Sequence, residues 1–117
     1  MTNGTLNQAN ELVMARNVLM SDFTFEWDKE KALPNELKHG ISFVEATTIF
    51  ADVYLITYPD EEHSDWEEHS ISIGLSAQRR ILLAVHTERN TAIRIISCRK
   101  ATKTKPRTYE QSVPRQL

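Results

Sequence analysis

The C-terminal half of the chain holds three consecutive segments in which apolar residues alternate with polar ones or form short apolar runs. They are SISIGLS at 70–76, RRILLAVHTE at 79–88 and AIRIISCR at 92–99. Segments of this length that are rich in β-branched residues predict strands, and the short polar connection RNT predicts a tight antiparallel hairpin between the last two. The chain is therefore expected to build a small antiparallel sheet.

A fourth strand is predicted at residues 23–28, where FTFEWD alternates aromatic and polar residues. A helix is expected to follow over KEKALPNELKHG, with Asp28 as its N-cap and Gly40 as its left-handed C-terminal stop. Pro34 lies beyond the first turn of that helix, where proline removes a backbone hydrogen bond and clashes with the preceding turn. We therefore predict a kink, or two short turns in place of one regular helix.

A second helix is predicted over SFVEATTIF, because Ser42 and Glu45 have the spacing of a capping box. A last short helix is expected between Thr102 and Tyr109, interrupted by Pro106. The order of one strand, two helices, three strands and a final helix indicates an α+β fold with a small sheet.

A single domain is expected, because 117 residues with 40% hydrophobic content can bury one core but not two. We place this domain at residues 23–110, after a polar and flexible N-terminal extension at 1–22 and before a C-terminal tail at 111–117. The single cysteine, Cys98, excludes an intramolecular disulfide, and no apolar run approaches the roughly 18 residues that cross a membrane. With no recognisable signal peptide, the protein is expected in the cytoplasm and without a membrane partner.

Charge is distributed unevenly along the sequence, although the formal net charge is only −2. Residues 51–75 contain seven acidic and no basic residues, whereas residues 76–117 contain ten basic and two acidic residues, a net of +8. A basic segment of this kind is typical of a phosphate-binding surface with an acidic flank. The alternative is that both groups of charges only solvate the surface.

The four histidines give little indication of a metal-binding or catalytic site. His63 and His69 lie in the acidic stretch HSDWEEH, whose spacing matches no established metal-ligand pattern, so we favour an exposed loop and predict no metal site. His39 precedes the expected C-cap glycine, where a cation interacts well with the helix end. His86 lies on the apolar side of its strand, as a core histidine does, but its place near the hairpin turn also makes it a catalytic candidate.

The arginines are more suggestive. Arg94 interrupts an apolar strand, so it must be paired with a carboxylate such as Glu26 or Glu88, or else contact a ligand. Arg89 precedes the turn and Arg99 follows the strand. Strict alternation places Arg94 and Arg99 on opposite faces, and a β-bulge or a bend would bring them together. Guanidinium groups bind phosphate in a bidentate manner and stay protonated, which suits charge stabilisation on phosphorus.

The combined order of these motifs resembles the BrnT family. The motifs are FEWD with KHG, then F..A, TER and RIIS.R.AT, followed by a tyrosine, and the resemblance covers residues 23–110. BrnT proteins are small ribonuclease toxins of bacterial type II toxin–antitoxin systems. The resemblance implies a RelE-like α+β fold, with a small antiparallel sheet, two N-terminal helices and a short C-terminal helix.

The resemblance also implies an activity and partners. The expected activity is endoribonuclease cleavage that inhibits translation and needs no metal or cofactor. The expected partners are the RNA substrate and a cognate, BrnA-like antitoxin that neutralises the toxin, with promoter DNA bound only through the antitoxin complex and a homodimer within that complex. The alternative is a catalytically impaired member that only binds the antitoxin in an autoregulatory complex.

Several residues match the family's motifs: Lys31, Asn35, Lys38, His39 and Gly40 in the first-helix region, and Arg89, Arg94, Arg99, Ala101, Thr102 and Tyr109 near the C-terminus. Where the family has a Glu-Arg pair this chain has Lys105 and Pro106, and where it often has an arginine this chain has His69.

We expect the three arginines at positions 89, 94 and 99 to hold the phosphate. Tyr109 or His86 is expected to act in proton transfer or to stack on a base. A tyrosine serves as a base only where neighbouring cations lower its pKa. The lysines expected to contact RNA are Lys31, Lys38, Lys100 and Lys103.

Overall fold

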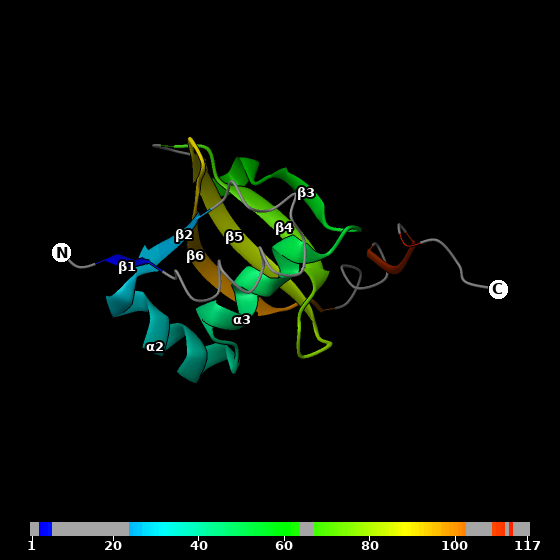
Figure 1. Ribbon diagram of the computed structural model, residues 1–117, viewed down its shortest axis with the longest axis horizontal. Coiled ribbons are helices and arrows are strands. Elements are labelled where there is room, and N and C mark those ends of the chain that lie inside the picture. The colour runs from blue at the N-terminus through cyan, green and yellow to red at the C-terminus, as the bar shows by residue number, and fades with distance from the viewer. Residues whose placement is uncertain (1–2, 6–23, 64–66, 103–108, 112, 114–117) are drawn as a thin grey trace.

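The structure is a computed structural model that describes residues 3–5, 24–63, 67–102, 109–111 and 113. Its centre is a six-stranded sheet with the strand order β1-β2-β6-β5-β4-β3 (Figure 1). The strands are β1 (Asn3–Thr5), β2 (Thr24–Asp28), β3 (Ile56–Pro59), β4 (Ser70–Leu75), β5 (Ile81–Arg89) and β6 (Ala92–Lys100).

The helices are few and short, and they are α2 (Lys29–His39), α3 (Phe43–Thr48) and the 3-10 turns η2 (Ile49–Ala51) and η3 (Glu61–His63). Residues 109–111 form a further helical turn. The predicted α+β class and the three strands of the C-terminal half are confirmed. None of the helices in the described part of the chain is long and apolar enough to cross a membrane.

The prediction of an antiparallel sheet is wrong for one strand pair. β2 runs parallel to β6, with Phe25 opposite Ile93 and Trp27 opposite Ile95, whereas the other pairs are antiparallel. The reason is the connection: after β2 the chain passes through α2 and α3 and enters the sheet again at its far edge. β2 then lies beside the last strand of the domain, and this long connection permits a parallel pair, which a tight hairpin cannot form.

Two strands were not predicted. β3 pairs with β4 at residues 56–59, for which no strand was predicted, and β1 pairs with β2 inside the predicted N-terminal extension. The other residues of the extension lie outside the described part of the chain, as do Lys103, Lys105, Pro106 and most of the C-terminal tail.

α2 continues through Pro34 as one helix, so the predicted division into two turns is wrong. The predicted caps are confirmed. The Asp28 side chain accepts a hydrogen bond from the Glu30 N–H at 2.9 Å, and Gly40 ends the helix in the left-handed conformation. Besides its caps, the helix is held to the sheet at its middle, where the Asn35 side chain hydrogen-bonds to the backbone of Cys98 in β6.

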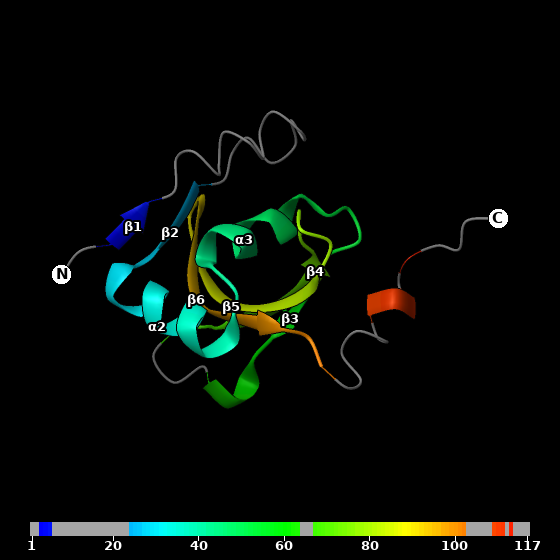
Figure 2. The same ribbon diagram turned by 90° about the horizontal axis from the view of Figure 1, so that it is seen from below.

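The sheet separates two apolar clusters. α3 and η2 cover one face, and Figure 2 shows α3 on one side of the strands with the β3–η3 segment on the other. The larger cluster lies under α3 and consists of Phe25, Trp27, Ile41, Phe43, Ala46, Ile49, Phe50, Leu82, Ala84, Ile93, Ile95 and Cys98. The smaller cluster, on the opposite face, is built around Ile73, Leu83 and Tyr109.

Candidate functional site

A β-bulge in β6 decides which arginines share a face. Val85 is opposite Ser97, but its neighbour His86 is opposite Ile95, so Ile96 is an extra residue in β6. Before the bulge Ile95 is buried under α3, and after it Cys98 is buried on that same face. Arg94 and Arg99 therefore both belong to the opposite face, as expected if a bulge intervened.

A cavity of about 480 Å³ opens on this opposite face. Residues of β4, β5 and β6 provide an apolar floor, and residues of the segment between β3 and β4 provide a polar wall. The lining residues are Asp60, Glu62, His63, His69, Ile71, Leu83, Val85, Ile96, Ser97 and Arg99. An apolar floor with a few convergent polar groups is typical of a ligand-binding site.

Asp60 organises the polar wall. Its backbone N–H donates to the carbonyl of His69 at 2.8 Å, which extends the β3–β4 ladder by one pair. Its carboxylate oxygens lie 3.2 and 3.0 Å from Nδ1 of His63. The His63 backbone N–H also donates to the Asp60 carbonyl at 3.3 Å. Asp60 thus holds both histidines at one end of β3 and β4.

Arg99 is the guanidinium that lines the cavity. Arg99 pairs with Leu83 of β5, which belongs to the cavity floor. Arg99 itself is exposed to solvent. Its Nη1 donates to the carbonyl of Lys100 at 3.4 Å. A solvent-accessible guanidinium beside a cavity is suited to bind a phosphate group.

Arg94 and Arg89 form ion pairs on the same face, nearer the hairpin turn. Nη1 of Arg94 lies 3.7 Å from Oε1 of Glu26, and the Arg94 side chain is only 15% exposed. Nη2 of Arg89 donates to Oε2 of Glu67 at 2.9 Å. This hydrogen bond holds the pKa of Glu67 below its ordinary value and raises the pKa of Arg89. The alternative expectation that Arg94 pairs with Glu26 is confirmed.

The three arginines do not converge on one point. Arg89 ends β5, whereas Arg99 lies opposite Leu83, six residues earlier in that strand. At about 3.3 Å per residue these positions are roughly 20 Å apart, which is longer than two arginine side chains span to reach one phosphate. The arginines instead follow the direction of the strand pair.

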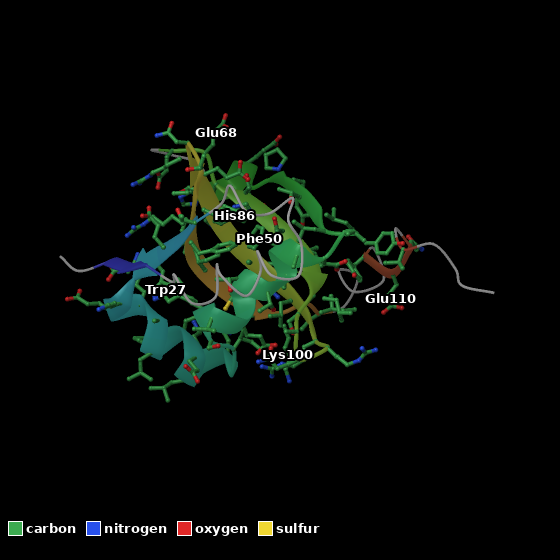
Figure 3. All side chains as sticks on the ribbon, in the orientation of Figure 1. Trp27, Phe50, Glu68, His86, Lys100 and Glu110 are labelled. Atoms are coloured by element: carbon green, nitrogen blue, oxygen red, sulfur yellow. The ribbon has the colours of Figure 1, made fainter. Side chains whose placement is uncertain are left out.

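His86 is a core residue. It is fully buried, its Nε2 lies 2.7 Å from Oγ of Ser72, and its ring meets the Phe50 ring edge to face at 5.1 Å (Figure 3). Burial lowers the pKa of His86 to about 4. The structural interpretation of this histidine is thus the one that its surroundings support.

Tyr109 is also part of the fold. It is buried in the cluster opposite α3, and its hydroxyl donates to Oδ2 of Asp52. Asp52 also accepts hydrogen bonds from the N–H groups of Tyr54 and Leu75, both at 2.9 Å. Burial and the Asp52 carboxylate raise the pKa of Tyr109. The lowered pKa that proton abstraction by Tyr109 requires is therefore absent.

The lysines lie elsewhere. Lys31 and Lys38 are exposed residues of α2, which packs against the edge of β6, and neither lines the cavity. Lys100 ends β6, and Figure 3 places it at the opposite end of the sheet from Glu68. Lys103 lies outside the described residues.

Sequence reasoning missed the histidine wall. The sequence spacing of His63 and His69 did not indicate that the two side chains line one cavity. They do so because β3, which was not predicted, pairs with β4. The apolar residues before Pro59 were the signal for that strand. Among the described residues no group of three His, Cys, Asp or Glu side chains is arranged to hold a metal ion.

Comparisons with known proteins agree with the α+β fold and identify a family. A family described as "Ribonuclease toxin, BrnT, of type II toxin-antitoxin system" matches residues 27–105, more than half of the chain. Among solved structures, the crystal structure of the Brucella abortus ribonuclease toxin BrnT matches with a TM-score of 0.52 and 21% sequence identity, covering 66% of this chain and 94% of that one. At this identity the structural match establishes the fold only. No curated protein sequence matches the chain.

The family match runs from residue 27 in β2 to residue 105, and so includes the helices α2 and α3, the strands β3 to β6 and every residue that lines the cavity. The chain therefore belongs to the BrnT family of ribonuclease toxins of type II toxin–antitoxin systems.

Proposed function

We propose that this protein is an endoribonuclease toxin that binds RNA in the cavity opposite α3. The observation that carries the proposal is the position of Arg99. This exposed guanidinium lines a cavity whose floor is apolar and whose wall contains two histidines. A phosphate on Arg99 would place the adjoining nucleotide over the floor formed by Leu83, Val85 and Ile96.

The proposed reaction is metal-independent. The 2′-hydroxyl of RNA is an internal nucleophile, so the protein has to supply a base, cationic stabilisation of the phosphorus centre and correct positioning. Arg99 supplies the cation. Arg89, at the hairpin end of β5, and the exposed lysines Lys31, Lys38 and Lys100 are proposed to contact the RNA backbone outside the cavity.

The remaining proposals follow from membership of the family. A RelE-like architecture, inhibition of translation and a cytoplasmic location are inferred for this chain. Its partner is proposed to be a BrnA-like antitoxin that neutralises it, with promoter DNA bound through the antitoxin and a toxin homodimer within the complex.

The test is cleavage by the purified protein of an RNA oligonucleotide with a 5′ label, in buffer containing EDTA. We expect products that end in a 2′,3′-cyclic phosphate, and no cleavage of the DNA oligonucleotide of the same sequence. Because DNA lacks the 2′-hydroxyl, cleavage of both substrates would contradict the proposed chemistry. A requirement for added divalent metal would contradict metal independence.

A second test uses bacterial growth. Expression of the protein alone should arrest growth, and coexpression of the cognate antitoxin should restore it. Pulse labelling of new protein during arrest distinguishes inhibited translation from general toxicity.

One observation favours a second candidate, an inactive member that only binds its antitoxin. Of the side chains expected to be catalytic, Arg94, His86 and Tyr109 all have structural partners. Harmless expression of the folded protein, with formation of a stable antitoxin complex, would establish this alternative.

A further inference from the structure

We propose that Asp60 and His63 form the proton-transfer pair of this ribonuclease, with His63 as the base for the 2′-hydroxyl and Asp60 as its positioning residue. The inference rests on the proposed function. It goes beyond the arginines and Tyr109, because it assigns the base to a segment that sequence analysis placed in an exposed acidic loop.

The geometry of the pair supports this role. Both carboxylate oxygens of Asp60 lie within 3.2 Å of Nδ1 of His63. A carboxylate only accepts hydrogen bonds, so Nδ1 carries the proton in this contact. The lone pair of the neutral ring then lies on Nε2, which is the tautomer that a general base requires.

The pair is also placed where a substrate can reach it. The Asp60 side chain is only 10% exposed, whereas that of His63 is 67% exposed. The nearly buried Asp60 carboxylate therefore contacts an imidazole ring that solvent and substrate can reach at the cavity wall. The short turn η3 connects the two residues, and pairing of the Asp60 N–H with the His69 carbonyl fixes this turn to the sheet. The imidazole is therefore positioned by the fold while its outer edge faces solvent.

The other ionisable groups in the cavity fit the same reaction. His69 and Glu62 line the cavity with His63, and Arg99 lines it from β6. Arg99 is suited to the phosphate, and the Asp60 carboxylate stabilises the imidazolium that forms when His63 takes a proton. The two residues first considered for proton transfer, His86 and Tyr109, do not line the cavity. His86 is fully buried, and the Tyr109 hydroxyl is hydrogen-bonded to Asp52.

The proposed step is balanced. The 2′-oxygen attacks phosphorus as its proton passes to Nε2 of His63, so that the O2′–P bond forms and the P–O5′ bond breaks. The leaving 5′-oxygen takes a proton from a water molecule, and the resulting hydroxide is neutralised by the proton on His63. The products are a 2′,3′-cyclic phosphate and a 5′-hydroxyl, with no co-reactant consumed.

The first experiment measures single-turnover cleavage of an RNA oligonucleotide by the full-length protein and by its His63→Ala and His63→Gln variants. Both changes should lower the rate about 100-fold or more, the usual contribution of a general base. His63 is well exposed, so circular dichroism should show folded variants. His39→Gln, at the end of α2 and outside the cavity, is the matched control and should cleave at the wild-type rate.

Two further readouts separate chemistry from structure. Added imidazole should restore part of the activity of His63→Ala, because the small base enters the vacated position. Asp60→Asn should lower the cleavage rate of the folded protein, because an amide can present its NH₂ group to Nδ1 and no longer fixes the tautomer with the lone pair on Nε2, and Asp60→Glu should recover part of the loss. Glu62, His69 and Arg99 line the cavity in both Asp60 variants, so the difference in rate between them reports the lost carboxylate.

The outcomes are distinct. If the wild type cleaves RNA and the His63 variants cleave equally well, the assignment of the base is overturned and the proposed function stands. An Asp60→Asn variant that cleaves at the wild-type rate overturns the positioning role. If the wild type cleaves no RNA, both the function and the proton-transfer pair are overturned.

Discussion

The Arg80 guanidinium and the Glu45 carboxylate form an ion pair that joins the turn between β4 and β5 to the first turn of α3. Nε of Arg80 donates to Oε2 of Glu45 at 2.9 Å, and the Ser76 hydroxyl donates to the same oxygen at 2.7 Å. The Glu45 side chain is only 3% exposed. Burial raises the pKa of Glu45, but the hydrogen bonds from Arg80 and Ser76 outweigh it and the net pKa is lowered.

Arg80→Ala should lower the free energy of unfolding by roughly 3 kcal/mol, because it leaves a buried carboxylate without its cation. Urea denaturation at pH 7 measures this change. The double variant Arg80→Ala/Glu45→Gln should recover part of the loss, since no charge remains buried. A change below about 0.5 kcal/mol for Arg80→Ala would place the pair among surface ion pairs of little consequence.

The same pair predicts a pH dependence. Since the pKa of Glu45 is lower in the folded than in the unfolded state, its contribution is complete above the unfolded pKa near 4.5 and is lost as the pH falls through the folded value. Stability should therefore decrease on acidification below about pH 4.5. The decrease should be smaller in Arg80→Ala, which can be checked by urea denaturation at a series of pH values.

Asn35 completes the edge of β6 where β2 has ended. Its Oδ1 accepts from the Cys98 N–H at 3.2 Å, and its Nδ2 donates to the Cys98 carbonyl at 2.9 Å. The side-chain amide thus replaces a neighbouring strand. Asn35→Leu should destabilise the protein by about 2 kcal/mol, because two backbone groups lose their partners.

Amide hydrogen exchange of Cys98 is the specific measurement for this variant. Exchange at Cys98 should accelerate in Asn35→Leu relative to the other buried amides of β6. The exposed Leu37→Asn on the same helix is the control, since Leu37 is 78% exposed and its replacement should leave both stability and exchange unchanged. Equal exchange at Cys98 in the wild type and Asn35→Leu would contradict the edge-capping role.

His86 predicts a second pH effect, in a different range. Burial lowers the pKa of His86 from 6.5 to about 4, so between these values the unfolded chain binds a proton that the folded chain does not. Stability should be complete above about pH 6.5 and should fall toward pH 4 by roughly 3 kcal/mol, at 1.36 kcal/mol per pKa unit. His86→Leu should remove most of this slope, as measured by thermal unfolding. An unchanged slope would mean that other groups titrate in this range.

Local patterns were sufficient to predict much of the fold. The hairpin of β5 and β6 was predictable because its apolar alternation and the Asn90 turn are encoded within a few residues, and Asn90 adopts the left-handed conformation with φ of 55°. The caps Asp28 and Gly40 were predictable for the same reason. The parallel pairing of β2 with β6 was not, because it depends on how two helices return the chain across the sheet.

The candidate site was harder to predict, because its residues meet through non-local pairing. His63 reaches the cavity only because β3 pairs with β4, and four residues ending in Pro59 carry a weak strand signal. Glu45 looked like the second half of a capping box, but its carboxylate bonds to Arg80, 35 residues away. The bulge at Ile96, which determines the face of Arg99, has no marker in the sequence.

Tyr109 should act in stability and not in cleavage. Tyr109→Phe removes the hydroxyl that donates to Asp52, and we expect a loss of about 2 kcal/mol, typical of a hydrogen bond to a charged partner. The cleavage rate of the folded variant should equal that of the wild type, because the hydroxyl is buried and its raised pKa opposes proton loss. A large loss of cleavage with unchanged stability would return Tyr109 to the site.

Arg99 and Arg94 provide the sharpest contrast, since they share a strand and a face but differ in partners. Arg99→Ala should abolish most RNA cleavage with little change in stability, because its guanidinium is exposed beside the cavity. Arg94→Ala should lower stability by about 1 kcal/mol through loss of the pair with Glu26, while the folded variant still cleaves RNA. Single-turnover cleavage and urea denaturation of both variants, with Arg79→Asn on the β4–β5 turn as the arginine control, measure the two effects separately. If Arg94→Ala abolishes cleavage and Arg99→Ala does not, the phosphate is held nearer the hairpin turn and the site must be placed there.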